Sequence, residues 1–262
     1  MTERPQPDNL RVEVDSEARV GRLYLDRADK LNAITMQMRR DIGRCFEWFT
    51  EDDRVRVVVV RGAGDTAFSA GGDIPEFLRT PAPDMANLAY HLGAPERCPK
   101  PVIAAIDGHC YGGGLEFALA CDFRIATPRS RFAFPEITLG AMPGSGGTQR
   151  AVRLMGLTRA KAMVLTGLPI DAEQAERYGL ITRVVPVEAF EQEIQRLAQR
   201  LVKLSPVALR FAKTALNRAL DASLAAGLEM EGKAMAILTS MEDFADGVKA
   251  WAAQREPNFK GR

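Results

Sequence analysis

Apolar and polar residues alternate near the start of the chain, and the alternation predicts two half-buried β-strands. The segments are 10–15 (LRVEVD) and 18–26 (ARVGRLYLD), and a period of two residues places one face of a strand on a core. Because only the polar pair Ser16-Glu17 separates them, we expect the two strands to form a hairpin.

A helical period follows, and it predicts an amphipathic helix through MQMRRDIGRCFEWFTED, residues 36–52. We expect the side chain of Thr35 to cap the start of this helix. The apolar residues that recur at three- and four-residue spacing are Met38, Ile42, Cys45, Phe46 and Phe49.

Beyond this helix, apolar strand-like segments alternate with helical ones. Continuous apolar runs at 55–62 and 100–108 predict strands buried on both faces. Shorter strands are expected at 122–127, which RFAFPE follows, and at LITRVV, and helices at 84–93, 147–156, 158–166 and 171–178. From Val187 to about Ala253 the pattern is almost wholly helical. We therefore predict an α/β core with mostly parallel strands over residues 1–186 and a C-terminal helical region over 187–262.

Composition and charge exclude several classes of protein. The 262 residues are 46% hydrophobic and 26% charged, which is ordinary for a globular protein. A net charge of +1 without basic runs gives no reason to expect nucleic acid or an anionic membrane as a partner. The sequence has neither a membrane-spanning apolar stretch nor a signal-peptide core. We expect a soluble, cytoplasmic protein.

Metal and cofactor motifs are weak throughout the chain. The four cysteines lack CxxC spacing and only two histidines occur, so no metal site is predicted. GAGDTA (62–67) fits a dinucleotide fingerprint, but Gly71 and Gly72 argue against the helix that must follow. PGSGG (143–147) resembles a hydrolase elbow, yet both histidines precede it in the chain.

Three glycine-rich stretches remain: SAGGD (69–73), YGGGLE (111–116) and PGSGG. Each alone is compatible with a tight turn. However, the first two each follow a buried strand, and such loops form the ligand crevice of α/β sheets. We expect these two loops to lie side by side, each with an N–H group available to a ligand oxygen.

Two glutamates stand in apolar surroundings, and two interpretations of them are open. Glu116 lies in the helix that follows YGGG, and Glu136 lies after Pro135, where a loop is expected. Each glutamate would be structural if paired with an arginine such as Arg124 or Arg150. Together with the glycine loops, they instead indicate a dry pocket with an oxyanion hole and two carboxyl groups for proton transfer.

At this point the sequence closely resembles the enoyl-CoA hydratase (crotonase) family over essentially its whole length. The segments that carry the resemblance, in order, are DRADKLNAI, AFSAGGDI, KPVIAAIDGHCYGGGLEFALACDFRIA, FAFPEITLGAMPGSGGTQR, AERYGLITRVVP and PNFKG. The resemblance implies a spiral of β-β-α turns with a C-terminal helical region that builds trimers. Two trimers usually stack into a hexamer.

The resemblance also implies roles for individual residues. The N–H groups of Ala70 and Gly113 would form the oxyanion hole, and Glu116 and Glu136 would be the catalytic pair. Residues expected to contact coenzyme A are Lys30, Ala70, Gly71, Gly72, Asp73, Ile74 and Gly113. Tyr111 and Gly144, with region 84–97, would shape the acyl pocket. No cofactor is implied, because coenzyme A is part of the substrate.

Three positions depart from the family pattern. Asp26 and Ala28 replace an asparagine and a proline near the expected adenine site. Gln254 stands about where hydratases often carry a lysine for the CoA phosphates of a neighbouring subunit. We expect Arg255 or Lys260 to substitute for that lysine.

The function that the resemblance implies is hydration of a 2-enoyl-CoA, with Glu116 as the main base and Glu136 as the main acid. Keeping both glutamates favours hydration over isomerisation, decarboxylation or hydrolysis. One alternative is a double-bond isomerase on the same scaffold. Another is a non-catalytic RNA-binding relative, which would need a lysine-rich helical face. The helix through residues 36–52 carries three arginines, but also Asp41 and Glu47.

Overall fold

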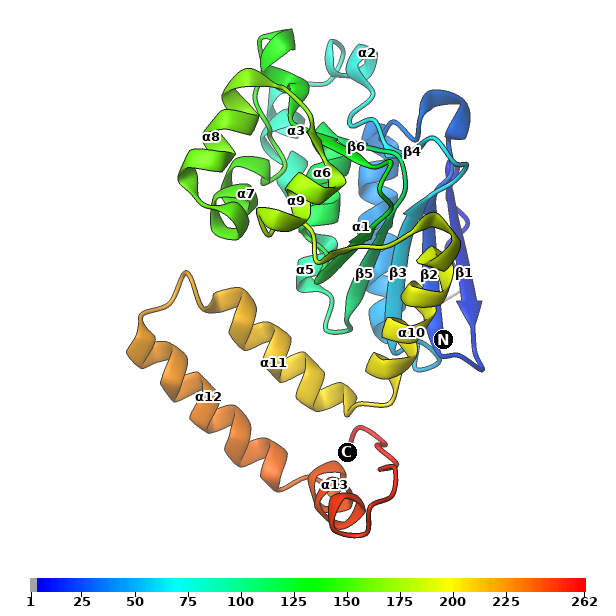
Figure 1. Ribbon diagram of the computed structural model, residues 1–262, viewed down its shortest axis with the longest axis vertical. Helices are drawn as coiled ribbons and strands as arrows, with labels where there is room; N and C mark the ends of the chain where they lie inside the picture. Colours follow the sequence, from blue (N-terminus) through cyan, green and yellow to red (C-terminus); the bar gives the residue numbers. More distant parts are fainter. Residues whose placement is uncertain (1–3) are drawn as a thin grey trace.

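The computed structural model describes residues 4–262, and Figure 1 shows two β-sheets with helices around them and a helical extension. The strands are β1 Leu10–Asp15, β2 Val20–Leu25, β3 Val57–Gly62, β4 Ala67–Ser69, β5 Val102–Ile106, β6 His109–Tyr111, β7 Phe123–Ala126, β8 Arg131–Ala133, β9 Ile170–Asp171 and β10 Arg183–Val184.

The α-helices are α1 Met36–Glu51, α2 Ile74–Phe77, α3 Ala82–Ala86, α4 Leu88–Leu92, α5 Ala94–Arg97, α6 Gly112–Leu119, α7 Gly147–Met155, α8 Leu157–Thr166, α9 Ala172–Arg177, α10 Phe190–Val202, α11 Pro206–Arg218, α12 Leu224–Thr239 and α13 Glu242–Ala252. The 3-10 helices are η1 Ala28–Lys30, η2 Pro135–Leu139 and η3 Val187–Ala189.

The strands form two separate sheets. The larger has the order β1-β2-β3-β5-β7-β10, and the smaller has the order β4-β6-β8-β9. In the larger sheet β1 and β2 pair antiparallel as the expected hairpin, and every later pairing is parallel. In the smaller sheet only β8 and β9 are antiparallel. The mostly parallel core predicted from the sequence is confirmed.

Successive strands alternate between the two sheets, which makes the fold a spiral. The pairs β3-β4, β5-β6 and β7-β8 each place their first strand in the larger sheet and their second in the smaller one. Helices follow each pair before the chain returns to the larger sheet. This repeated β-β-α turn confirms the fold that the family resemblance implies.

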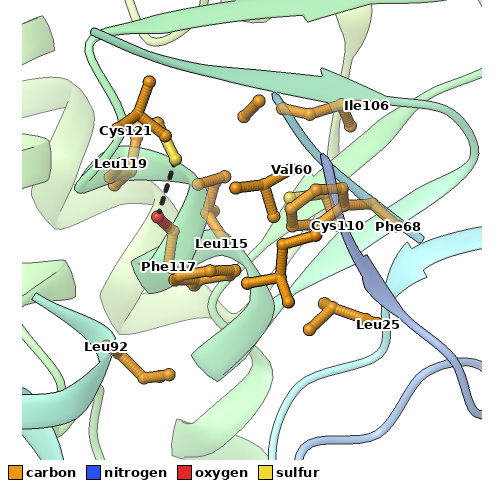
Figure 2. Close-up of a cluster of buried hydrophobic side chains, with 14 of the residues drawn as sticks. Leu25, Val60, Phe68, Leu92, Ile106, Cys110, Leu115, Phe117, Leu119 and Cys121 are labelled. Carbon is orange, nitrogen blue, oxygen red and sulfur yellow. Dashed lines mark hydrogen bonds between the residues drawn. The ribbon is translucent and has the colours of Figure 1, made fainter. Parts of the chain in front are cut away.

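The core lies on both faces of the larger sheet, as the unbroken valine run of β3 predicts. Val58 and Val60 belong to the larger apolar cluster, whereas Val57 and Val59 face the smaller cluster beneath α10. Figure 2 shows Leu115 and Phe117 of α6 inside the larger cluster, with the Cys121 thiol donating to the Phe117 carbonyl at 3.5 Å. The apolar side of α6 is therefore fixed in the core.

Several predicted elements have different bounds in the structure. The helix expected at 84–93 is divided into α3 and α4, because Asn87 between them leaves helical geometry and its amide bonds back to Pro83. The glycine-rich stretch before Glu116 is not a separate turn, since α6 begins at Gly112 itself. Thr35 caps α1 as predicted, and its hydroxyl accepts from the Met38 N–H at 3.0 Å.

The C-terminal part is helical, as expected, but its helices differ in their surroundings. Helix α10 packs on the larger sheet through Phe190 and Ile194, whereas α11, α12 and α13 extend away from the sheets in Figure 1. Residues 1–3 of the predicted 1–186 core lie outside the described residues, and the division at 186/187 stays a prediction. Within residues 4–262, the structure has no helix long and apolar enough to cross a membrane.

Candidate active site

The two glycine loops that follow β4 and β6 lie side by side. The strands pair in parallel, with Ser69 opposite Cys110, so their carboxyl ends meet at one edge of the smaller sheet. The backbones approach so closely that a Cβ atom on Gly114 would stand 2.5 Å from Cβ of Ser69. A Cβ atom on Gly113 would stand 3.5 Å from the Gly72 nitrogen. The predicted juxtaposition of the two loops is confirmed.

The available N–H groups of these loops are those of Gly72 and Gly113. The prediction for Ala70 is wrong, because its N–H donates to the Leu31 carbonyl at 2.9 Å and cannot also face a ligand. For the Gly72 N–H, the described part of the chain supplies no acceptor. Gly113 is the second residue of α6, where N–H groups lack intrahelical partners, and residues 4–262 supply no other acceptor for it.

Two glycines in left-handed conformations direct these N–H groups. Gly71 has φ +108° and Gly112 has φ +48°, values that residues with a side chain rarely adopt. Each of them immediately precedes one of the two available N–H groups. Their backbone conformations therefore set the directions in which the Gly72 and Gly113 N–H groups point.

Polar side chains from the segment after β2 hold the first glycine loop and the chain that leads into it. The buried Asn32 amide donates to the carbonyls of Ala63 and Ala67 at 2.9 and 2.8 Å. Arg27 donates to Asp73 Oδ2 at 2.8 Å. Asp73, predicted to contact coenzyme A, is therefore engaged by the protein itself. Lys30 and Ile74, also predicted as contacts, are exposed near the same loop.

Glu116 is only 2% exposed, and the third glycine-rich stretch surrounds its carboxylate. Glu116 Oε1 accepts from the N–H groups of Ser145 and Gly147 at 2.6 and 2.8 Å. These two bonds compensate a charge that burial alone would disfavour. Sequence reasoning did not identify this role of PGSGG, although its position just before a helix start is typical of anion-binding N–H groups.

The arginines suggested as structural partners of the glutamates are engaged elsewhere. Arg124 donates to the carbonyls of Leu180 and Cys121. Arg150 forms its ion pair with Glu96, at 2.5 Å. The structure does not support the interpretation in which these arginines neutralise Glu116 and Glu136.

Glu136 lies in η2 and faces α6 one turn before Glu116. Its Oε1 atom would stand 2.9 Å from a Cβ atom on Gly112, and its buried Oε2 atom has no hydrogen-bond partner within residues 4–262. Burial, together with the nearby Glu116 carboxylate, raises the pKa of Glu136 to about 7. Close to neutral pH, Glu136 is therefore poised between its acid and base forms.

The two residues assigned to the acyl pocket lie in different surroundings. A Cβ atom on Gly144 would stand 3.6 Å from Leu88 Cδ1, which connects the PGSGG stretch to region 84–97. The Tyr111 hydroxyl lies 3.1 Å from His109 Nδ1. Their roles at an acyl pocket stay predictions.

One further residue at the site was not singled out from the sequence. Arg39 of α1 is 2% exposed and donates to the Ser145 hydroxyl at 3.0 Å. The signal was present, because Arg39 precedes the apolar residues Ile42 and Phe46 by three and seven positions on one helix face.

Together these groups can stabilise a developing oxyanion and move protons beside it. Two neighbouring N–H groups are suited to a carbonyl oxygen that gains negative charge. Beside them lie one carboxylate held by backbone N–H groups and one carboxyl group with a raised pKa. Such a difference between two carboxyl groups is typical of an acid–base pair.

Comparison with known protein families gives a match to nearly the whole chain. A family model described as "Enoyl-CoA hydratase/isomerase" matches residues 15–262. The Rhizobium meliloti (strain 1021) protein named "Probable enoyl-CoA hydratase" is 39% identical over 95% of this chain and 97% of its own. The Mycosarcoma maydis protein "Enoyl-CoA isomerase/hydratase fer4" is 36% identical over 96% and 97%.

Solved structures give the same result. The 1.8 Å crystal structure of the enoyl-CoA hydratase from Bacillus anthracis has a TM-score of 0.90 and 34% identity, covering 97% of this chain and 100% of that one. A structure from Geobacillus kaustophilus HTA426 has a TM-score of 0.91 and 38% identity, covering 97% and 98%.

Proposed function

The chain belongs to the enoyl-CoA hydratase/isomerase family, and we propose that it is an enoyl-CoA hydratase that adds water across the 2,3 double bond of a 2-enoyl-CoA. The observation that carries this proposal is the position of two glutamates, Glu116 and Glu136, beside a pair of available backbone N–H groups. The product is a 3-hydroxyacyl-CoA.

In the proposed reaction, the thioester oxygen accepts hydrogen bonds from the N–H groups of Gly72 and Gly113. Water adds at Cβ, and negative charge then develops on that oxygen in an enolate-like state. Donors aimed at this charge stabilise the transition state more than the ground state. The loss of one such donor typically lowers the rate by about 10²–10³.

The two glutamates handle the protons of this reaction. Glu116, held as a carboxylate by two N–H groups, takes a proton from the attacking water. Glu136, whose pKa is raised to about 7 by burial and by Glu116, delivers a proton to Cα. In the proposed active form, Glu136 carries the proton that it delivers. The proposed reaction adds water without oxidation or reduction, and backbone N–H groups stabilise the oxyanion, so it requires no metal or redox cofactor. Coenzyme A is part of the substrate.

Hydration of crotonyl-CoA, followed by the loss of enoyl-thioester absorbance, tests this proposal. We expect the purified protein to turn over this or another 2-enoyl-CoA. Glu116→Gln and Glu136→Gln should each lower kcat by at least about 10². Wild-type turnover by either variant would exclude the two-glutamate mechanism.

Double-bond isomerisation is the second candidate function. It is supported by the relative from Mycosarcoma maydis, whose name includes both isomerase and hydratase. A 2-enoyl-, 3-enoyl- and 3-hydroxyacyl-CoA panel with product analysis distinguishes the two reactions. A hydratase interconverts the first and third compounds, whereas an isomerase interconverts the first and second.

We further propose that the chain assembles into a trimer or a dimer of trimers, in which a C-terminal cation reaches the coenzyme A of a neighbour. Arg255 is engaged by Asp246 at 2.6 Å. Lys260 is exposed, and its backbone N–H donates to Asp243, while no ion pair of its side chain occurs within residues 4–262. Lys260 is therefore the better candidate for this contact.

A further inference from the structure

Arg39 is a buried cation next to the two available N–H groups. Its Nη2 atom would stand 3.0 Å from a Cβ atom on Gly113. Standard backbone geometry then places Nη2 roughly 5.5 Å or less from the Gly113 nitrogen. Its Nη1 atom donates to the Ser145 hydroxyl at 3.0 Å, and Ser145 also holds Glu116 through its N–H. The guanidinium therefore borders the place proposed for the reacting thioester.

The charge of Arg39 lacks a direct counter-ion in the protein. Within residues 4–262, no carboxylate oxygen lies within 4.0 Å of it, and its buried Nε has no hydrogen-bond partner. Burial lowers the pKa of Arg39 to about 10, while the more distant Glu116 and Glu76 raise it, so the group is still protonated at neutral pH. An uncompensated buried charge is costly.

Other buried cations of this protein are satisfied by protein groups. Arg124 donates to two backbone carbonyls, and Lys213 forms an ion pair with Asp122 at 2.7 Å. Arg39 differs because its Nη2 atom lies beside Gly113 and its buried Nε has no partner, while no carboxylate oxygen of the described residues forms an ion pair with it. A planar guanidinium with unused donors is well suited to bind a carboxylate.

Resting on the proposed hydratase function, we propose that the acyl group of the natural substrate carries a second carboxylate and that Arg39 binds it. The thioester oxygen would occupy the N–H groups of Gly72 and Gly113, and the second carboxylate would reach Arg39. The closeness of Arg39 to Gly113 limits the separation of the two groups to a short acyl chain. The substrate class is therefore a short 2-enoyl-CoA derived from a dicarboxylic acid, and Arg39 determines this specificity.

A matched pair of substrates tests the inference. Glutaconyl-CoA, a five-carbon 2-enoyl-CoA ending in a carboxylate, is compared with 2-pentenoyl-CoA, which has the same chain length and no second charge. We expect kcat/KM to favour glutaconyl-CoA, and Arg39→Met to lower that preference by on the order of 10², as expected when one partner of a buried charge pair is removed. Arg39→Lys should keep part of the preference. Arg40→Met, which removes an exposed arginine of the same helix, is the control and should keep all of it.

A role of Arg39 in every turnover, through the oxyanion or through Ser145, predicts a different result. Arg39→Met would then lower kcat/KM for both substrates by the same factor. That outcome, or equal wild-type kcat/KM for the two substrates, overturns the carboxylate inference and leaves the hydratase proposal intact.

Binding of unreactive analogues separates failure of the inference from failure of the proposed function. Glutaryl-CoA and pentanoyl-CoA are saturated and cannot be hydrated, so calorimetry measures only their affinity. We expect glutaryl-CoA to bind at least about tenfold tighter to the wild type, and to lose this advantage in Arg39→Met. This result without any hydration of enoyl-CoAs would reject the hydratase and support the anion site. Equal affinities for the wild type would reject the anion site.

Discussion

At the scale of single residues, the two glutamates differ in what surrounds their oxygens. Two backbone N–H groups hold Glu116, while Glu136 has a buried oxygen without a partner within the described residues. Hydrogen bonds to a carboxylate favour its charged form, whereas burial favours the neutral form. The surroundings of Glu116 therefore favour its charged form, and those of Glu136 favour its neutral form. The sequence does not show this difference, because both residues are glutamates in apolar segments.

The raised pKa of Glu136 predicts the pH dependence of catalysis. Because kcat/KM reports the free enzyme, hydration should decline as the pH rises through about 7, where Glu136 loses its proton. The reverse dehydration passes through the same transition state, with the same number of protons, and should show the same alkaline decline. Stopped-flow pH profiles in both directions measure this, with Glu136→Gln as the variant that should lack the decline. A flat profile from pH 6 to 9 would contradict the assignment.

Site residues could be predicted from the sequence only where their residue type is unusual in its surroundings. The glutamates and the glycine loops were identified because a carboxyl group in an apolar segment and clustered glycines are unusual. Which N–H is available could not be predicted, since it depends on Leu31, a distant residue that occupies the Ala70 N–H. Arg39 was overlooked although its spacing to Ile42 and Phe46 places it on the apolar face of the helix, because a charged residue is ordinarily expected on the solvent side, where its neighbour Arg40 lies.

At the scale of elements, the crossing of β4 and α6 holds the two glycine loops together. Gly114 packs so tightly on Ser69 that an added Cβ would also stand 2.9 Å from the Ser69 carbonyl oxygen. Ser69 in turn bonds to the Asn32 carbonyl and to the Gly71 N–H. A displacement at this crossing is therefore transmitted to the loop that carries the Gly72 N–H.

Gly114→Ala tests this crossing, with Gly232→Ala as its matched control. The first variant should lose about 1–3 kcal/mol of stability through overpacking and should also lose kcat, because the two N–H groups move apart. Gly232 lies in α12 with no atom within 4 Å of its Cβ position, so alanine there should add about 0.5–1 kcal/mol. Thermal unfolding and crotonyl-CoA turnover measure both effects. Equal behaviour of the two variants would show that the crossing does not position the loops.

The longer elements were predictable and the shorter ones were not, for a physical reason. β1, β3 and α1 are long enough for a period of two, a continuous apolar run or a period of 3.6 to appear. β4, β6 and β8 have three residues each, too few for any period. The second sheet, and hence the spiral, followed only from the family resemblance.

At the scale of the whole molecule, the helical extension exposes many apolar side chains. The exposed ones on α11, α12, α13 and the turn between α11 and α12 are Leu216, Leu220, Leu224, Leu228, Met235, Ile237, Phe244, Val248 and Trp251. Large apolar surfaces of this kind usually mark protein contacts. Trp251 is 83% exposed in the single chain, and tryptophan is among the residues most enriched at protein contacts. The extension is therefore the expected site of assembly.

The assembly predicts how the mass in solution responds to substitution on the extension. The wild type should elute with three or six chain masses in size-exclusion chromatography with light scattering. Trp251→Glu should shift it towards the single chain, because a charge would then be buried without a partner. Arg177→Gln, on the exposed side of α9, should leave the mass unchanged.

If Lys260 serves a neighbouring subunit, the Trp251→Glu chain should also show a raised KM for crotonyl-CoA, since its coenzyme A would lose that contact. A wild type that elutes as a single chain at micromolar concentration would refute the assembly. In that case Trp251→Glu should not raise the KM for crotonyl-CoA.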